Sequence, residues 1–232
     1  MVARDRDVQA FGDRAASYEA GYRGQMHSDI VGRSIDLALG RFPPPQRVLD
    51  VGCGTGLLLR ELARRLPEAI SLTGIDAAAE MVGQAAGRTA AARAARLGPG
   101  APAGGVPGTA RTPADAGTLA GGDSRLVFLQ GVAEHLPFPD RAFDLVISTT
   151  SFDHWADQAA GLAECRRVLA PGGHLVLTDL FSSCLLPTLV GTRRNRARTP
   201  LRATRLLAAS GFRSIRWHRL YAVIIRSVTA SA

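Results

Sequence analysis

One stretch of the sequence decides the fold: Arg47-Val48-Leu49-Asp50-Val51-Gly52-Cys53-Gly54-Thr55-Gly56. Its apolar residues before the turn predict a buried strand, and its glycines predict a tight turn. The leucine-rich stretch that follows, at 57–66, has the spacing of a helix. A strand, a glycine loop and a helix in this order place backbone N–H groups beside a ligand at the carboxyl end of the strand.

The spacing of the glycines separates the possible ligands. A dinucleotide loop reads G-x-G-x-x-G, which would need glycine where this chain has Leu57. A phosphate-binding P-loop ends in Lys followed by Ser or Thr, and no such pair follows Gly56. The loop here instead carries an acid, Asp50, followed by three glycines at alternate positions. Taken alone it also fits any parallel strand–helix–strand unit with a glycine turn, so the rest of the chain has to decide.

The basic residues are all arginine and are unevenly distributed. The net charge is +8, and residues 180–232 hold ten arginines and no acid. Six of these arginines crowd the segment 193–205. An anionic partner such as RNA, a membrane surface or an acidic substrate is one interpretation, and a solvated basic face is the other. We favour the solvated face, because no aromatic residues interleave these arginines as stacking on nucleic acid would need.

Length and composition predict one domain with a substantial core, since the chain has 232 residues of which 46% are hydrophobic. The charged N-terminus leads into no apolar segment and predicts no secretory signal. No apolar run approaches the ~18 residues of a membrane span. Cys53, Cys165 and Cys184 are scattered, and no cluster has metal-ligand spacing. We therefore expect a cytoplasmic protein without a metal and without a membrane partner.

Strand and helix patterns alternate along the chain, which predicts a parallel sheet covered on both faces. Residues 8–40 have helical spacing in two pieces, and Phe11, Ala15, Tyr18 and Tyr22 fall at such spacing. Further strands are expected at 71–76, 125–131, 143–148, 174–180, 212–220 and 222–228, the last two as a hairpin. Further helices are expected at 77–97, 157–169 and 201–209.

Residues 98–124 interrupt this alternation with a low-complexity stretch of Gly, Ala, Pro and Thr. They contain too few large apolar residues to offset the entropy of ordering the chain. We interpret them as a flexible insertion, and we expect that deleting most of them leaves folding intact.

Four stretches together resemble the class I S-adenosylmethionine (SAM) methyltransferases. They are 48–56; 72–76 with Met81; 131–138 with 143–146; and 164–173. They occur in order and at suitable spacing, from about Phe11 to the C-terminus apart from the insertion. The resemblance is to the small-molecule enzymes of ubiquinone, menaquinone and natural-product biosynthesis (the "type 11" subgroup).

This resemblance implies the fold and the reaction. The fold is a Rossmann-like, doubly wound α/β sheet of about seven strands, mostly parallel, with an antiparallel C-terminal hairpin strand. Residues 1–232 form one domain, with lid helices at 1–40 and an arginine-rich cap segment at 182–210. SAM is the cofactor, S-adenosylhomocysteine the product, and a small molecule the methyl acceptor. The protein is expected to be a monomer or a homodimer.

The resemblance also implies roles for individual residues. The cofactor would be held by Tyr18, Asp50, Gly52, Cys53, Gly54, Asp76, Ala77, Met81, Ala133, Glu134 and Thr149. Asp50 and the loop would hold the methionine part, Asp76 the ribose and Met81 the adenine. Met81 also fits an ordinary core position, Cys53 a packing position and Glu134 a solvated loop. The family usually has an acid where this chain has Val132, so adenine recognition would depend on the Ala133 backbone and Glu134.

The acceptor side is expected to follow the strand at 143–148. Tyr22, His27, Phe152 and Trp155 are the candidate substrate contacts. His154 is the candidate catalytic residue, as a base or as a substrate hydrogen-bonding group, because an imidazole can accept a proton from a hydroxyl acceptor. The alternative is that His154 is structural. A base is needed only for an acceptor that must lose a proton, and no catalytic triad is expected.

Two other functions remain open at this point. An RNA or protein methyltransferase would use the arginine-rich region, although the Asn/Asp-Pro-Pro-aromatic motif of many amide methyltransferases is replaced by Ser148-Thr149-Thr150-Ser151. A SAM-binding regulator without transferase activity is the third possibility, and Val132 is its support. Retention on nucleic acid that weakens with salt would distinguish an RNA methyltransferase from a small-molecule methyltransferase.

Overall fold

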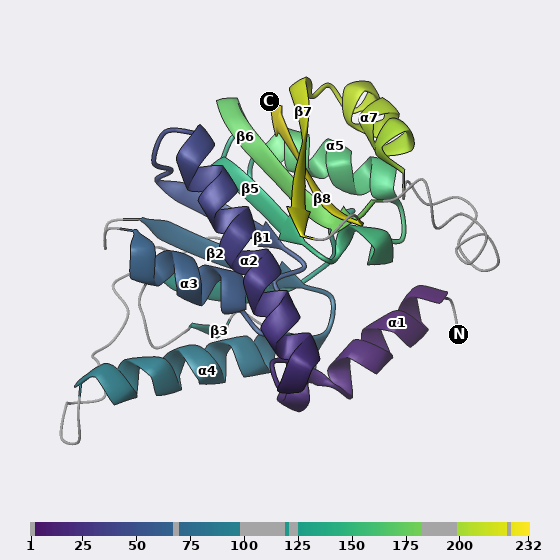
Figure 1. Ribbon diagram of the computed structural model, residues 1–232. Coiled ribbons are helices and arrows are strands. Elements are labelled where there is room, and N and C mark those ends of the chain that lie inside the picture. The colour runs from purple at the N-terminus through teal and green to yellow at the C-terminus, as the bar shows by residue number, and fades with distance from the viewer. Residues whose placement is uncertain (1–2, 67–69, 98–118, 121–124, 182–198, 222–223) are drawn as a thin grey trace.

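The computed structural model of the chain describes residues 3–66, 70–97, 119–120, 125–181, 199–221 and 224–232. An eight-stranded sheet lies at its centre (Figure 1), with the strand order β3-β4-β2-β1-β5-β6-β8-β7. The strands are β1 Arg47–Val51, β2 Ser71–Asp76, β3 Leu119–Ala120, β4 Leu126–Gln130, β5 Phe143–Thr149, β6 Leu169–Leu180, β7 Arg213–Tyr221 and β8 Ile225–Ser231.

The five central strands β4, β2, β1, β5 and β6 are parallel, whereas β3 and β8 pair antiparallel with their neighbours. The predicted doubly wound α/β class is therefore confirmed. The chain runs outward from β1 through β2 to β4, and then returns to β5 on the other side of β1. Such a reversal leaves a crevice at the carboxyl ends of the strands, where open α/β sheets bind their ligands.

Helices cover both faces of the sheet (Figure 1). They are α1 Ala3–Gly12, α2 Gly21–Arg41, α3 Leu57–Arg65, α4 Ala79–Leu97, α5 Gln158–Val168 and α7 Pro200–Ala209, with short 3₁₀ turns η1 Ala15–Ser17 and η2 Phe152–His154. Asp157 caps α5 by accepting N–H bonds from Ala159 and Ala160, and Thr199 caps α7 by accepting from Arg202.

Alternation along β1 sets which side chain faces which layer. Val48 packs into the core formed with α2, α3 and α4, whereas Leu49 and Val51 pack into the core formed with α5 and α7. Asp50 therefore falls on the face of Val48, because side chains alternate along a strand. The same alternation places the one acid of β1 on the face that α2, α3 and α4 cover.

Several predicted boundaries need correction. Two residues of the predicted insertion, Leu119–Ala120, form β3 on the edge of the sheet, so the sheet has eight strands; the rest of 98–124 lies outside the described residues. The last strand is Ile225–Ser231, because Tyr221 pairs with Ile225 across the hairpin. β6 begins at Leu169, before Pro171-Gly172-Gly173, because Leu169 already pairs with Phe143. Of the predicted cap segment, 182–198 lies outside the described residues.

The N-terminal helices also differ from the prediction. The first ends at Gly12 and is followed by η1, and α2 starts only at Gly21, whose φ is +65°. This backbone conformation favours glycine and starts the new helix in a different direction. Tyr18 and Tyr22 therefore do not share a helix, although their spacing in the sequence is helical.

Candidate functional site

A pocket opens at the carboxyl ends of the central strands, with about 950 Å³ of empty space including its mouth. Its floor is the glycine loop after β1 and the ends of β2 and β5. Its roof is the lid segment, which we define as residues 3–27: α1, η1 and the first turns of α2. Val8, Phe11, Tyr18 and His27 line the pocket from this lid segment.

The three glycines of the loop are required for different structural reasons. All have positive φ, at 77° for Gly52, 52° for Gly54 and 75° for Gly56. A Cβ on Gly52 would lie 2.2 Å from Ser151 Oγ, and one on Gly56 would lie 2.8 Å from the ring of Phe128. A Cβ on Gly54 would meet nothing within 4 Å. Because Gly54 also lines the pocket, its backbone is open to a ligand.

Asp76 is fixed at the end of β2 by the backbone. Its Oδ2 accepts the Gly54 N–H at 2.8 Å, and its Oδ1 accepts the Ala78 N–H at 2.9 Å. A carboxylate oxygen accepts more than one hydrogen bond, so both oxygens keep capacity toward the pocket. Burial raises the pKa of Asp76, against these backbone bonds. The carboxyl is thus oriented in advance for two ligand donors.

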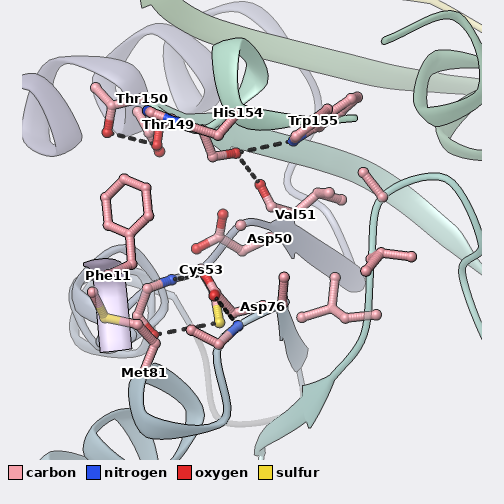
Figure 2. Close-up of a pocket in the computed structure, with 18 of the residues that line it drawn as sticks. Phe11, Asp50, Val51, Cys53, Asp76, Met81, Thr149, Thr150, His154 and Trp155 are labelled. Carbon is pink, nitrogen blue, oxygen red and sulfur yellow. Dashed lines mark hydrogen bonds between the residues drawn. The ribbon is translucent and has the colours of Figure 1, made fainter. Parts of the chain in front are cut away.

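Asp50 is buried at the pocket wall, with 2% of its surface exposed, and its Oδ1 has no hydrogen-bond partner. Burial, and after it the nearby charge of Asp76, raise the pKa of Asp50 to about 8. In Figure 2 its carboxyl group points toward the space between Phe11 and the Thr149-Thr150 turn. A buried polar atom without a partner needs an explanation, and a cationic or N–H-bearing ligand group would supply the missing partner.

The end of β5 forms the opposite wall. Thr150 has φ of 54°, which is unusual for a β-branched residue, and its N–H is held by the Thr178 carbonyl at 2.8 Å. Its side-chain hydroxyl donates to the Thr149 carbonyl at 2.8 Å. Tyr18 of the lid segment lines the same pocket, and burial raises the pKa of its phenol. Such outliers cluster at functional sites.

Ion pairs hold the lid segment to the floor of the pocket. Arg60 on α3 binds both carboxylate oxygens of Glu19, at 2.8 and 3.0 Å, and Arg88 on α4 lies at 3.3 Å. The Thr55 hydroxyl also donates to Glu19. Although burial favours the neutral carboxyl, these partners lower the pKa of Glu19. One lid residue is thus bound to the glycine loop and to two helices.

His154 ends η2 and lines the pocket. Its ring lies edge-to-face against Phe11, with centroids 4.8 Å apart. The imidazole therefore contacts the lid segment at the wall of the pocket.

The structure brings nearly all of the predicted site residues together. The pocket is lined by Tyr18, His27, Asp50, Gly52, Cys53, Gly54, Asp76, Ala77, Met81, Ala133, Glu134, Thr149, His154 and Trp155. Trp155 also packs against Gly161 and beside Ala133, and its role as a substrate contact stays a prediction. Cys53 packs near Gly74, and burial raises its pKa, as the packing interpretation expects.

Two predicted substrate contacts do not line the pocket. Tyr22 is 76% exposed, because α2 restarts at Gly21 and directs it away. Phe152 is 1% exposed and packs in the core between Trp155 and Phe181, with ring centroids at 5.1 and 6.1 Å. The 3₁₀ turn η2 separates its direction from that of His154. Neither side chain is therefore placed at the pocket wall by these elements.

Some lining residues and one anchor were missed. Val8 and Phe11 line the pocket, and Glu19 anchors its roof. Thr150 and Ser151 also line it and belong to the stretch after β5 where the acceptor side was expected. Glu19 lies 41 residues from Arg60 in sequence, so no local pattern could identify the pair. Glu134 is not a free loop acid, since its Oε1 accepts the Asp157 N–H at 3.0 Å.

The part of the chain that the structure describes contains no group of three or more His, Cys, Asp or Glu suited to a metal ion. In the same residues, no helix has the length and apolar character needed to span a membrane.

A reversing parallel sheet, an acid–glycine loop with open backbone, and a second acid at the next strand end define a class: the class I methyltransferases, which bind SAM. The chain belongs to the methyltransferase domain family, whose sequence profile matches residues 22–231.

Individual relatives agree with this assignment. The malonyl-[acyl-carrier protein] O-methyltransferase of Geobacter sulfurreducens is 32% identical over 232 positions, covering 93% of this chain and 73% of the relative. The demethylmenaquinone methyltransferase of Thermus thermophilus is 35% identical over 147 residues, or 63% of this chain. The chain spans about half the length of that relative and about a quarter of another curated relative.

Solved structures share the fold. A SAM-dependent methyltransferase from Aquifex aeolicus aligns with a TM-score of 0.63 at 18% identity, over 95% of this chain and 97% of that one. The [4+2]-cyclase SpnF aligns with a TM-score of 0.60 at 22% identity, over 89% and 79%. Since a cyclase has this fold too, the activity has to be argued from the site.

Proposed function

We propose that the protein transfers a methyl group from SAM to a small-molecule acceptor, at oxygen, nitrogen or carbon. The observation that carries the proposal is the buried Asp50 carboxyl, whose Oδ1 lacks a partner and which lines the same pocket as Asp76. Among the described residues, the lining holds Asp50, Asp76 and Glu134 but no arginine, although the chain has 28 basic residues. An acidic pocket in a basic protein suits a cationic ligand such as a sulfonium.

The residues present fit SAM. Asp50 would accept from the ammonium of its methionine part, and the two oxygens of Asp76 from the ribose hydroxyls. Met81 lies in an apolar cluster with Ala15 and Ala78, where an adenine ring would pack. Glu134 is held through its Oε1 by the Asp157 N–H, so its second oxygen and the Ala133 backbone are the polar groups left for the adenine edge. Bound SAM supplies a methyl group on an activated leaving group, so the protein mainly aligns the reactants.

A small-molecule acceptor is supported by the enclosed pocket and by the names of the relatives, which act on quinone-type and acyl-carrier-bound substrates. The RNA or protein alternative is less favoured, because exposed arginines that could bind such a partner lie away from the pocket. Arg213, Arg216 and Arg219 are on β7, the edge strand three places from β5 in the sheet order. A reducing compartment such as the cytoplasm is the location that we propose.

Calorimetry tests the cofactor, and labelled methyl transfer tests the reaction. We expect SAM and S-adenosylhomocysteine to bind and NAD not to bind. A panel of phenols, amines and activated carbon acids with methyl-labelled SAM should then yield a labelled product. Tight NAD binding, or no SAM binding, would contradict the proposal. Labelling of RNA or protein alone would favour the alternative acceptor.

His154 is the residue that we propose to contact the acceptor. If it is the general base, replacing it in His154→Ala should lower turnover by ~10²–10⁴-fold with SAM affinity nearly unchanged. If it only orients the acceptor, KM should rise with little change in turnover. The control is His218→Ala on β7, whose ring bonds Thr229 outside the pocket. A variant that loses thermal stability and leaves both constants unchanged would make His154 structural.

A further inference from the structure

We propose that Ser151 is a positioning residue of this site, which fixes the wall after β5 to the glycine loop that receives the cofactor. The inference rests on the proposed function, because it concerns how methyl donor and acceptor are aligned. Its argument comes from three hydrogen bonds and one steric contact around a single hydroxyl group.

The Ser151 hydroxyl joins three segments of the chain. It donates to the Val51 carbonyl at 2.9 Å, at the end of β1. It accepts the indole N–H of Trp155 at 3.2 Å, and it lies 2.8 Å from the hydroxyl of Ser148. Figure 2 shows the bonds that reach Val51 and Trp155 from one oxygen.

The number of protons and lone pairs on a hydroxyl fixes which partner of Ser151 donates and which accepts. Serine has one proton to donate and two lone pairs to accept with. The proton is used by the Val51 carbonyl, so Ser148 must be the donor in the pair of serines. All three capacities of Ser151 are then filled, and none remains for solvent. No other side chain at this position could both donate to a carbonyl and accept from an indole within the same space, apart from another small hydroxyl.

A steric contact reinforces the hydrogen bonds. The three heavy atoms nearest to a Cβ on Gly52 would all belong to Ser151, two of them within 2.4 Å. Glycine at 52 is therefore required partly because Ser151 lies so close. The contact couples the backbone of the cofactor loop directly to the wall.

Trp155 is held on its other sides by packing. It lies edge-to-face on Phe152, and a Cβ on Gly161 of α5 would come within 2.5 Å of its ring. It is 6% exposed and lines the pocket. Its indole N–H therefore has a fixed direction, and the bond to Ser151 sets where this wall lies relative to the loop. His154 is the residue before it and moves with the same segment.

Removing the hydroxyl should separate cofactor binding from alignment. In Ser151→Ala, the Val51 carbonyl and the Trp155 N–H both lose their partner, while Asp50, Gly54 and Asp76 are unchanged. We expect SAM affinity to change by less than about threefold. We expect methyl transfer to fall by about 10- to 100-fold, since small misplacements of reacting groups have effects of that order.

The decisive measurement needs no acceptor. The chain has two tryptophans, so an NMR spectrum shows two indole N–H signals. Trp217 bonds Thr204 at 2.9 Å and serves as the internal reference. We expect SAM to shift the Trp155 signal in the parent protein. In Ser151→Ala the Trp155 signal should already be displaced without ligand, and its response to SAM should be reduced at least by half.

Ser148→Ala is the matched control. It removes a hydroxyl from the same cluster and should cost similar stability, but it leaves both bonds from Ser151 to Val51 and Trp155 in place. Its Trp155 signal should still respond to SAM. An unchanged Trp155 response in Ser151→Ala, or an equal loss in both variants, would overturn the proposal. A parent protein that binds no SAM would instead overturn the proposed function, while the ligand-free spectra would still test the bond.

Discussion

Gly54→Val is expected to abolish SAM binding while the protein stays folded. A side chain here would enter open space in the pocket, since nothing lies within 4 Å of the position of its Cβ. The ligand would therefore meet a branched side chain where it now meets backbone. We expect the affinity to fall by at least about 100-fold, or roughly 2.7 kcal/mol. Calorimetry with SAM measures the loss, and circular dichroism monitors folding.

The positive φ of Gly54 complicates this variant, because valine there is strained whatever the space around it. Gly172→Val is a control with the same problem, since Gly172 has φ of 76° and also no neighbour within 4 Å of its Cβ position. Gly172 lies outside the pocket lining. Gly172→Val should lose similar thermal stability and keep SAM binding. Unchanged SAM affinity in Gly54→Val would contradict our assignment of the loop.

SAM binding is expected to strengthen as the pH rises toward 8. Asp50 has a pKa of about 8 in the ligand-free protein, so it is mostly protonated at pH 7. The cationic ligand favours the ionised carboxylate, and binding should release up to about one proton. The affinity should rise by up to about tenfold per pH unit between pH 5.5 and 7.5. This window avoids the titration of the ligand's own α-amino group, near 8.

Calorimetry in two buffers of different ionisation enthalpy counts the released protons. Asp50→Asn should abolish the release and flatten the pH dependence, while keeping the volume of the side chain. Proton release that persists unchanged in Asp50→Asn would assign it to another group, and no release in the parent would contradict a protonated Asp50.

Ionisation of Asp50 also lowers the free energy of unfolding of the ligand-free protein. The pKa of Asp50 is raised on folding from its ordinary 3.8, so the folded state binds more protons between about pH 4 and 8. Stability of the ligand-free protein should therefore fall as the pH rises through that window. Asp50→Asn should remove this loss and raise the unfolding free energy at pH 8 by roughly a few kcal/mol. Urea unfolding at pH 5 and pH 8 measures the difference.

The sequence predicted those parts of the site that follow from local pattern. Asp50 and Asp76 each stand at or near the end of a buried strand, and parallel strands bring such ends to one edge of a sheet. The turn between them was recognisable because alternate glycines mark positions where the backbone must adopt positive φ. The alternation of strand and helix was enough to place the pocket at the point where the strand order reverses.

Other parts depend on contacts that no local pattern records. Tyr22 has helical spacing from Tyr18, yet the positive φ of Gly21 breaks the helix between them. Phe152 and His154 are two residues apart in a 3₁₀ turn, and only the packing of Phe181 shows which of them is core. Ser151 appeared in the sequence as one of four small polar residues. Its importance depends on Val51, a hundred residues earlier.

The contacts of Glu19 bear on how fast the pocket can exchange its contents. Arg60, Arg88 and Thr55 must release this one carboxylate before the lid segment can lift. Part of the barrier to opening is therefore ionic, beside the apolar packing of Phe11 and Ala15 near Met81. Salt weakens the ionic part moderately, because the pairs are partly buried. Residence times of spent cofactor should shorten as ionic strength rises. The enzyme's turnover would then be tuned by its salt environment at a position remote from the chemistry.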